Sequence, residues 1–235
     1  GDCAAFSFNQ NKNLCSGEGG MFVTDDETLL KSAQSLWSFG ETRTPVESRD
    51  YHVYAMGWMY RNNDLTAAFG RAQLTKLDKY LEQQIANANR LTAALRDVAG
   101  LILPEEPAGF KHNWYNYVLR FDMVQLDIKE NHAQFRDQIV KAMTAEGVPT
   151  MVWQKFILPA MTVFQAKNAY GAGCPWSCHL AKYVNYDVNQ YPVAQQHCDT
   201  HACLVMALRA PNGDKVVDYL AAGLRKVMVN IDQFC

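Results

Sequence analysis

The chain has 235 residues, of which 49% are hydrophobic and 20% charged, and its formal net charge is −2. This is an ordinary globular composition, which suits one large domain or two small ones. No block of Lys and Arg indicates nucleic acid or an anionic membrane, and no apolar run approaches the roughly 20 residues that span a bilayer. No charged segment precedes an apolar core at the N-terminus, so we expect no signal peptide and a cytoplasmic protein.

The first elements in chain order form a predicted antiparallel pair. Residues 3–8, CAAFSF, are apolar and aromatic and predict a buried strand, and GMFVT at 20–24 predicts its antiparallel neighbour. Thr24 and Glu27 fit a capping box, with Thr24 as N-cap. We therefore expect a helix that begins there and reaches about Phe39.

Gly40 ends that helix in this interpretation, and residues 40–63 show no clear period, which predicts a long functional loop. Asn63 or Asp64 then caps one long helix that reaches about Val98. Its apolar residues keep three- and four-residue spacing along one stripe: Leu74, Leu77, Leu81, Ile85, Ala88, Leu91 and Leu95.

The remaining chain alternates short strands with helices. We expect strands at 101–103, 114–122 and 148–153, helices at 133–147, 193–202 and 214–230, and an irregular segment at 154–192. Strands that alternate with helices place the protein in the α/β or α+β class.

Lys12 stands alone between the first strand and the turn Gly17-Glu18-Gly19-Gly20. One interpretation is a solvated loop lysine followed by a tight turn. The other is chemical, because a deprotonated lysine amine is a nucleophile toward carbonyls and a strand end is a rigid place to hold it. The commonest such use is a Schiff base with pyridoxal phosphate.

The segment GDCAAFSFNQNKNLCSGEGGMFVTDD resembles the lysine segment of the DegT/DnrJ/StrS-type aminotransferases. These are pyridoxal-phosphate enzymes of fold type I that aminate keto sugars and related cyclitols. The positions that match the family pattern are Gly1, Asp2, Phe6, Ser7, Phe8, Lys12, Asn13, Leu14, Gly17, Glu18, Gly19, Gly20 and Thr24.

Three further blocks resemble the same family: GWMYRNNDLTAAFGRAQLTKLDKYLEQQ, HNWYNYVLRFD and the segment from YPVAQQH to GLRKV. The resemblance thus covers most of the chain and implies the C-terminal part of such an enzyme. Residues 1–63 would then end the large cofactor-binding domain, and residues 64–235 would form a long connecting helix and a small α+β domain. The cofactor's ring-nitrogen partner and stacking ring would precede Gly1, so we expect the chain alone to be inactive.

The resemblance also implies roles for individual residues. Lys12 would bind pyridoxal 5'-phosphate covalently and then move protons, Ser7 would hydrogen-bond the cofactor phosphate, and Asn13 would help to bind the cofactor by positioning the loop. Arg61 would bind the donor carboxylate, and Tyr60 would also contact the substrate. The alternative is that Ser7 is a strand hydroxyl bonded to the backbone, which is common, and that Arg61 is a surface salt-bridge partner.

The sequence departs from the family pattern at Met59, where an Asn usually reaches the phosphate of the neighbouring subunit. A methionine cannot donate a hydrogen bond to phosphate. Either Asn62 or Asn63 takes that role, or the contact between subunits is lost. The lysine at position 12 favours transamination, because relatives with histidine there act as dehydratases.

The cysteines and histidines open a second interpretation, a structural zinc site. The chain has seven cysteines, an odd number that favours reduced thiols over a disulfide framework. The spacing of the candidate ligands is not that of a standard zinc knuckle, and the family has no metal there, so we expect none. The candidates are Cys174, Cys178, His179, His197, Cys198, His201 and Cys203.

The resemblance therefore predicts an aminotransferase that moves an amino group from glutamate or glutamine to a nucleotide-linked keto sugar or a cyclitol. Because the family builds its active sites at subunit interfaces, we expect a homodimer. Two alternatives stay open: a relative that makes an aromatic amino acid from an amino-cyclohexanone precursor, and a catalytically incomplete dimerisation module.

Overall fold

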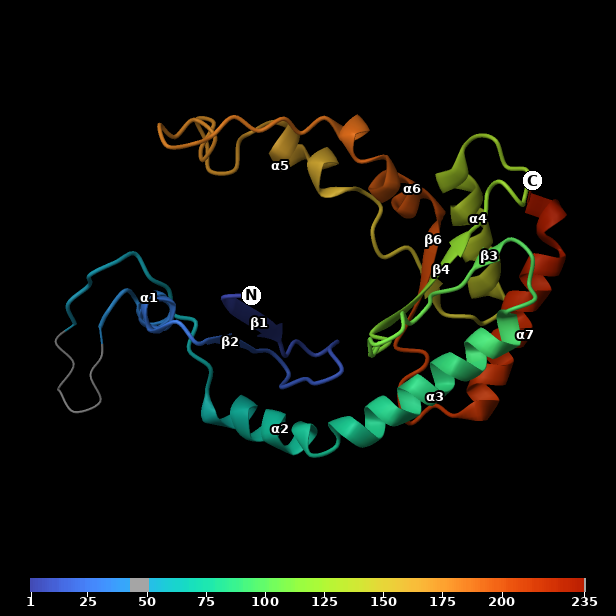
Figure 1. The fold of residues 1–235 in the computed structure, drawn as a ribbon, viewed down its shortest axis with the longest axis horizontal. Helices are drawn as coiled ribbons and strands as arrows, with labels where there is room; N and C mark the ends of the chain where they lie inside the picture. The colour runs from blue at the N-terminus through green and yellow to red at the C-terminus, as the bar shows by residue number, and fades with distance from the viewer. Residues whose placement is uncertain (43–50, 235) are drawn as a thin grey trace. The chain divides into compact units, whose positions relative to one another are not determined.

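The computed structural model describes residues 1–42 and 51–234 (Figure 1). The chain separates into two compact units, Gly1–Leu81 and Glu82–Cys235. Strands alternate with helices, in agreement with the expected mixed class. The middle of the expected loop at 40–63 and the last cysteine lie outside the described residues. The domain boundary that the sequence suggests at residue 63 stays a prediction.

The first unit opens with the hairpin of β1 (Cys3–Ser7) and β2 (Gly20–Thr24). The two strands pair antiparallel, with Cys3 opposite Thr24 and Ser7 opposite Gly20, so the expected pair is confirmed. The expected burial of the first strand is wrong, because all five residues of β1 are exposed. A two-stranded ribbon has no packed layer of its own that could cover both faces.

Helix α1 (Glu27–Trp37) is capped by Asp26 and not, as expected, by Thr24. The Asp26 carboxylate accepts hydrogen bonds from the amides of Thr28 at 2.7 Å and Leu29 at 3.0 Å. Thr24 is still paired in β2, and its hydroxyl donates to the Asp2 carbonyl at 2.6 Å. The cap therefore falls two residues later, at a carboxylate beyond the end of the strand.

The long helix expected after residue 63 is two helices, α2 (Asp64–Leu74) and α3 (Leu77–Leu95). Asn63 caps α2 as expected, and its side chain accepts from the Thr66 amide at 3.0 Å. The expectation of one continuous helix is wrong at Thr75, whose hydroxyl donates to the carbonyl of Ala72 at 2.9 Å. A β-branched residue that bonds its own preceding turn competes with the regular helical ladder.

The second unit contains a four-stranded antiparallel sheet in the order β3-β4-β6-β5. The strands are β3 (Leu101–Ile102), β4 (Asn116–Phe121), β5 (Thr150–Met151) and β6 (His201–Val205). Strands β3, β4 and β5 lie where the sequence predicts strands, although β5 is only two residues long. Strand β6, which pairs on both edges, was not expected, because its apolar run directly continues a helix.

The expected helices of this unit are confirmed as α4 (His132–Ala145), α6 (Pro192–Thr200) and α7 (Asp214–Val229). The segment 154–192 is irregular, as expected, apart from short turns of helix. These are η1 (Leu158–Ala160), α5 (Thr162–Gln165) and η2 (Val188–Gln190), and another, η3 (Ile231–Phe234), follows α7. No helix of the described residues is long and apolar enough to cross a membrane.

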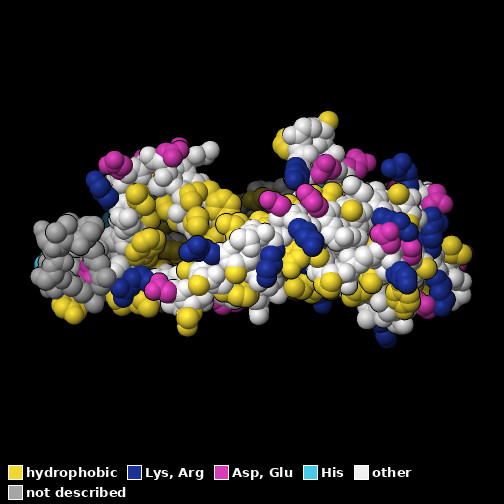
Figure 2. All heavy atoms as spheres, turned by 90° about the horizontal axis from the view of Figure 1, so that it is seen from below, with side chains coloured by type: hydrophobic (Ala, Val, Ile, Leu, Met, Phe, Trp, Pro, Cys, Tyr) yellow, Lys and Arg dark blue, Asp and Glu magenta, His cyan; other side chains and the backbone are white. Residues whose placement is uncertain are grey.

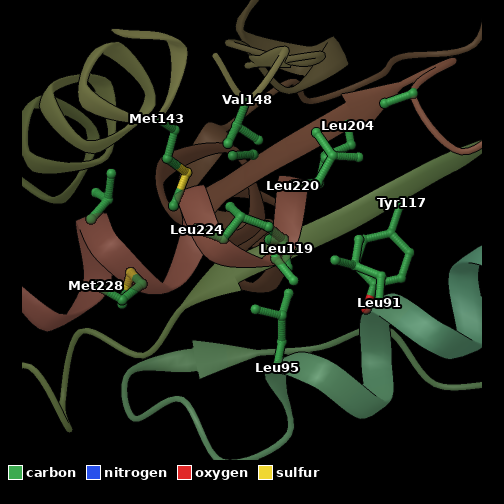
Figure 3. Close-up of a cluster of buried hydrophobic side chains, with 14 of the residues drawn as sticks. Leu91, Leu95, Tyr117, Leu119, Met143, Val148, Leu204, Leu220, Leu224 and Met228 are labelled. Carbon is green, nitrogen blue, oxygen red and sulfur yellow. The ribbon is translucent and has the colours of Figure 1, made fainter. Parts of the chain in front are cut away.

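The core of the second unit lies between one face of the sheet and its helices (Figure 3). Side chains of α3, β4, β6 and α7 point toward one another there, and Leu91, Leu119 and Leu224 are fully buried. Alternate residues of β4 face this core, as the period of a strand requires: Tyr117, Leu119 and Phe121. The same apolar stripe of the connecting helices becomes buried only in α3, from Ala88 onward.

Candidate active site

Lys12 lies in a short loop between β1 and β2, which is anchored at both ends. Its backbone amide donates to the carbonyl of Asn9 at 2.9 Å and closes a turn. Below that turn, Phe8 donates to the Gly19 carbonyl at 2.8 Å and accepts from the Ser16 amide at 2.9 Å. These two bonds continue the β1–β2 ladder, so Lys12 projects from a rigid extension of a hairpin.

The glycine-rich turn that closes the loop depends on having no side chain at Gly19. A Cβ atom there would lie 2.8 Å from the Ser16 hydroxyl and 3.0 Å from the Asn62 amide nitrogen. Ser16 itself is buried, and its hydroxyl donates to the carbonyl of Glu18 at 2.9 Å. Gly17, with φ +88°, supplies the left-handed backbone that the turn needs.

Helix α2 meets the lysine loop through small residues. The side chain of Asn62, just before the helix, lies against Gly19, and its oxygen accepts hydrogen bonds from the Asn63 amide at 2.9 Å and from the Thr66 hydroxyl. One turn further on, a Cβ atom on Gly70 would lie 3.3 Å from the Ser16 Cβ atom. The structure thus brings together the two sequence blocks with the most specific resemblance.

Ser7 is exposed at the end of β1, five residues before Lys12. Its hydroxyl accepts a 3.4 Å hydrogen bond from the Asn9 amide. A hydroxyl that only accepts keeps its own proton for a further acceptor. Asn13, next to Lys12, is half-buried.

Arg61 lines a cavity of about 570 Å³ beside α1. Its guanidinium carbon lies 5.4 Å from the centre of the Phe39 ring, at cation–π distance. Other residues around this cavity are Lys31, Gln34, Ser35, Trp37, Ser38, Glu41 and Thr42. The lining thus carries two cationic side chains and the carboxyl group of Glu41, and Lys31 also lies 3.7 Å from Glu27. The Arg61 guanidinium can bind an anionic group.

Tyr60 and Met59 belong to a segment that pairs with the end of α1. The Tyr60 amide donates to the Trp37 carbonyl at 3.0 Å, and Met59 forms a backbone bridge with Ser38. Both side chains are exposed, Tyr60 at 70% and Met59 at 56%. The Tyr60 ring stacks on Trp58 with 6.3 Å between centroids, so this segment presents aromatic faces to its surroundings.

His197 and His201, two of the candidate zinc ligands, form a stacked pair in the second unit. The rings of His197 and His201 lie 4.4 Å apart at an angle of 5°. His201 donates from Nδ1 to the His197 carbonyl at 2.7 Å and accepts at Nε2 from the Gln154 amide at 3.3 Å. Both ring nitrogens of His201 therefore form hydrogen bonds in a neutral imidazole, and a metal would have to displace one of these bonds.

Burial lowers the pKa of His201, and the buried Arg136 acts in the same direction. Burial also lowers the pKa of His197, followed by the effects of His201 and Arg120. Among the described residues no three His, Cys, Asp or Glu side chains gather as metal ligands would. The six cysteines of that part of the chain are free thiols. The expectation that no zinc binds stays a prediction.

Comparisons with known proteins extend these observations. Residues 1–206 match the model of the DegT/DnrJ/EryC1/StrS aminotransferase family. The chain is 37% identical over 128 residues to the spore coat polysaccharide biosynthesis protein SpsC of Bacillus subtilis, a match that covers 52% of this chain and 33% of SpsC. It is 33% identical over 159 residues to the dTDP-4-dehydro-2,3,6-trideoxy-D-glucose 4-aminotransferase of Saccharopolyspora spinosa, over 64% of this chain and 39% of that enzyme.

The fold is also that of known aminotransferases. The crystal structure of an aminotransferase, TlmJ, from Streptoalloteichus hindustanus matches with a TM-score of 0.73 at 24% identity, over 99% of this chain and 53% of that one. The chain thus spans about half the length of the solved structure and 33–39% of the two relatives. Because the family model matches well over half of its residues, the chain belongs to the DegT/DnrJ/EryC1/StrS aminotransferase family.

Proposed function

We propose that this protein is a pyridoxal-phosphate-dependent aminotransferase. The amino group passes from glutamate or glutamine to the keto group of a nucleotide-linked sugar or a cyclitol. The observation that carries the proposal is Lys12, held on an anchored turn between β1 and β2 in the segment that matches the family. The names of the relatives support a sugar as acceptor, because one of them acts on a dTDP-linked keto sugar.

The residues around Lys12 fit this cofactor. Lys12 offers an amine for covalent attachment, and the Ser7 hydroxyl, at the adjacent strand end, keeps a proton that it can donate to a phosphate oxygen. Pyridoxal phosphate, when bound, supplies the electron sink that makes the carbon-bound proton of the amino donor acidic. Once the donor's amine has displaced Lys12 from the cofactor, the free Lys12 Nζ would be the base that takes this proton and the acid that returns it.

Arg61 binds the donor carboxylate in this proposal, because a guanidinium holds a carboxylate through two parallel hydrogen bonds. Tyr60 adds an exposed ring that can pack on the substrate, and Asn13 supports the lysine turn. Asn62 and Asn63 use their side-chain oxygens at the start of α2. A phosphate contact from a partner subunit would therefore come from their amide nitrogens, in place of the residue that Met59 replaces.

The relatives are longer than this chain, so the proposal concerns a site to which further residues contribute. In this proposal the further residues are an acidic residue that pairs with the cofactor's ring nitrogen and an aromatic residue whose ring stacks on the cofactor. A homodimer with active sites at its interface is part of the proposal. Without these groups we expect residues 1–235 to have no transaminase turnover of their own.

Borohydride reduction tests the proposal directly. The complete protein is incubated with pyridoxal phosphate, reduced, digested and analysed by mass spectrometry. We expect the pyridoxyl group on the peptide that contains Lys12, and a Lys12→Arg variant as control should carry far less of it. A stable label on Lys31 or Lys111 instead of Lys12 would contradict the proposed function.

A further inference from the structure

Asn9 makes several hydrogen bonds within the lysine loop. Its carbonyl accepts from the Lys12 amide at 2.9 Å, and its side-chain oxygen accepts from the Asn11 amide at 3.0 Å. Its backbone amide donates to the Ser7 hydroxyl at 3.4 Å. Asn9 therefore bonds three residues of the segment from which Lys12 projects, namely Ser7, Asn11 and Lys12.

The remaining group of Asn9, its side-chain nitrogen, donates to the carboxylate of Glu18. The two distances are 2.8 Å to Oε1 and 3.1 Å to Oε2. Glu18 lies in the glycine-rich turn, where its carbonyl accepts from the buried hydroxyl of Ser16. The bond to Asn9 thus spans the loop, from the strand that precedes Lys12 to the turn that follows it.

In this contact Asn9 must be the donor and Glu18 the acceptor. The Asn9 oxygen is already occupied by the Asn11 amide, so the side chain can face Glu18 only with its NH₂ group. A carboxylate accepts and cannot donate while it is ionised. The pair is a charge-assisted hydrogen bond, which is stronger than a bond between neutral groups.

We propose that Asn9 and Glu18 are positioning residues for Lys12. Their bond holds the turn in one conformation, so that Lys12 Nζ is presented to the cofactor's carbonyl carbon without further ordering of the loop. Neither side chain touches the reacting atoms. The inference rests on the proposed function, because it needs Lys12 to be the residue that binds pyridoxal phosphate.

The test uses four variants of the complete protein, of which one reverses the polarity of the bond. Asn9→Asp keeps the acceptor for the Asn11 amide but places two carboxylates face to face. Glu18→Gln removes the charge and keeps an acceptor. The double variant restores one donor and one acceptor with reversed polarity. Asn11→Asp, in the same turn, is the matched control, because it adds the same charge where no side-chain bond of that residue is described.

The measurement is the rate at which the borohydride-fixed pyridoxyl group accumulates on Lys12. This rate is divided by the summed rate of labelling on all other lysines. We expect a loss of about tenfold for Asn9→Asp and of about twofold to threefold for Glu18→Gln, since a charge-assisted bond is lost or weakened. The labelling rate of the double variant should recover to within about threefold of that of the unsubstituted protein. The rate of Asn11→Asp should equal that of the unsubstituted protein.

Hydrogen exchange in the cofactor-free protein provides the second readout. The amides of Asn11 and Lys12 should exchange faster in Asn9→Asp and recover in the double variant, at unchanged thermal stability. If Lys12 is labelled equally fast in Asn9→Asp and in the unsubstituted protein, the positioning role is wrong and the proposed function stands. If Lys12 is not labelled in the unsubstituted protein, both are wrong. A double variant that is no better than Asn9→Asp also contradicts the inference.

Discussion

The two units of the chain are held together by different kinds of contact. Every buried hydrophobic side chain among the described residues lies in the second unit, between Ala88 and Met228. In the first unit the buried side chains are polar, namely Ser16, Ser38 and Glu41. Neither α1 nor α2 buries a residue, and hydrophobic side chains gather on the surface of that unit, beside the grey residues of Figure 2.

Backbone contacts take the place of a core in the first unit. Gly40 and Gly57 approach so closely that a Cβ atom on Gly57 would lie 2.0 Å from the Gly40 nitrogen. The Phe39 amide donates to the Trp58 carbonyl at 3.1 Å in the same crossing. The unit that carries the candidate site is thus shaped by turns and hydrogen bonds, while its apolar side chains stay uncovered. Exposed apolar patches mark interaction surfaces, so we expect further protein to cover this face.

The largest expected effect comes from removing a core side chain of the second unit. Leu224→Ala, at a fully buried position, should lower the free energy of unfolding by about 2–5 kcal/mol, because it leaves a cavity. Leu36→Ala in α1, where the side chain is 47% exposed, should cost less than about 1 kcal/mol. Urea denaturation of both variants measures the difference. Equal costs would show that the comparison between the units is wrong.

Gly57→Ala tests the backbone crossing of the first unit. Its methyl group would meet Gly40 and Phe39 backbone atoms, and such overpacking costs about 1–3 kcal/mol. Hydrogen exchange at the Phe39 and Trp58 amides should accelerate, while the exchange of core amides in α7 stays unchanged. Gly1→Ala, where a Cβ atom would come no closer than 3.8 Å to the Cys3 carbonyl oxygen, is the control and should change exchange little. Faster exchange in α7 would contradict a local effect.

Acid should destabilise the second unit through His201. Its pKa in the folded chain lies below the ordinary 6.5, so between the two values only the unfolded chain binds the proton. The free energy of unfolding is therefore highest above about pH 6.5 and falls as the pH drops through this window, by at most about 1.4 kcal/mol per pH unit. Denaturation at several pH values measures the slope, and His201→Gln should reduce it. His197, whose pKa is also lowered, contributes to the slope that remains. A slope unchanged in His201→Gln would contradict this assignment.

The smallest effect is expected from a single buried hydrogen bond. Tyr117 and Thr92 share a 2.7 Å bond between their hydroxyls, and burial raises the pKa of Tyr117 to about 12. Tyr117→Phe should cost about 0.5–1.5 kcal/mol in thermal or chemical denaturation. Tyr219→Phe, at a 60% exposed ring with a 3.3 Å bond, is the control and should cost less. A larger loss in the control would reverse this ranking.

Local patterns were sufficient for much of the fold. The hairpin of β1 and β2, the cap at Asn63 and helices α4 and α7 follow from short apolar runs, capping chemistry and apolar periodicity, which act over a few neighbouring residues. The predictions from sequence are wrong where contacts with residues far away in the chain decide the local structure. Strand β6 is apolar enough for either class, and only its pairing with β4 and β5 on both edges makes it a strand.

Part of the candidate site was likewise predictable from the sequence, and part of it was not. The sequence determined that Lys12 stands between a strand and a glycine-rich turn, because those residue types have local conformational meaning. Only the tertiary structure decided that Asn62 lies against Gly19 and that Asn9 bonds Glu18 across the loop. It also decided that Asn87, on the apolar side of α3, is fully buried and donates to the carbonyls of Leu208 and Asn212. These contacts join groups that are far apart along the chain or depend on one rotamer, and no local pattern records them.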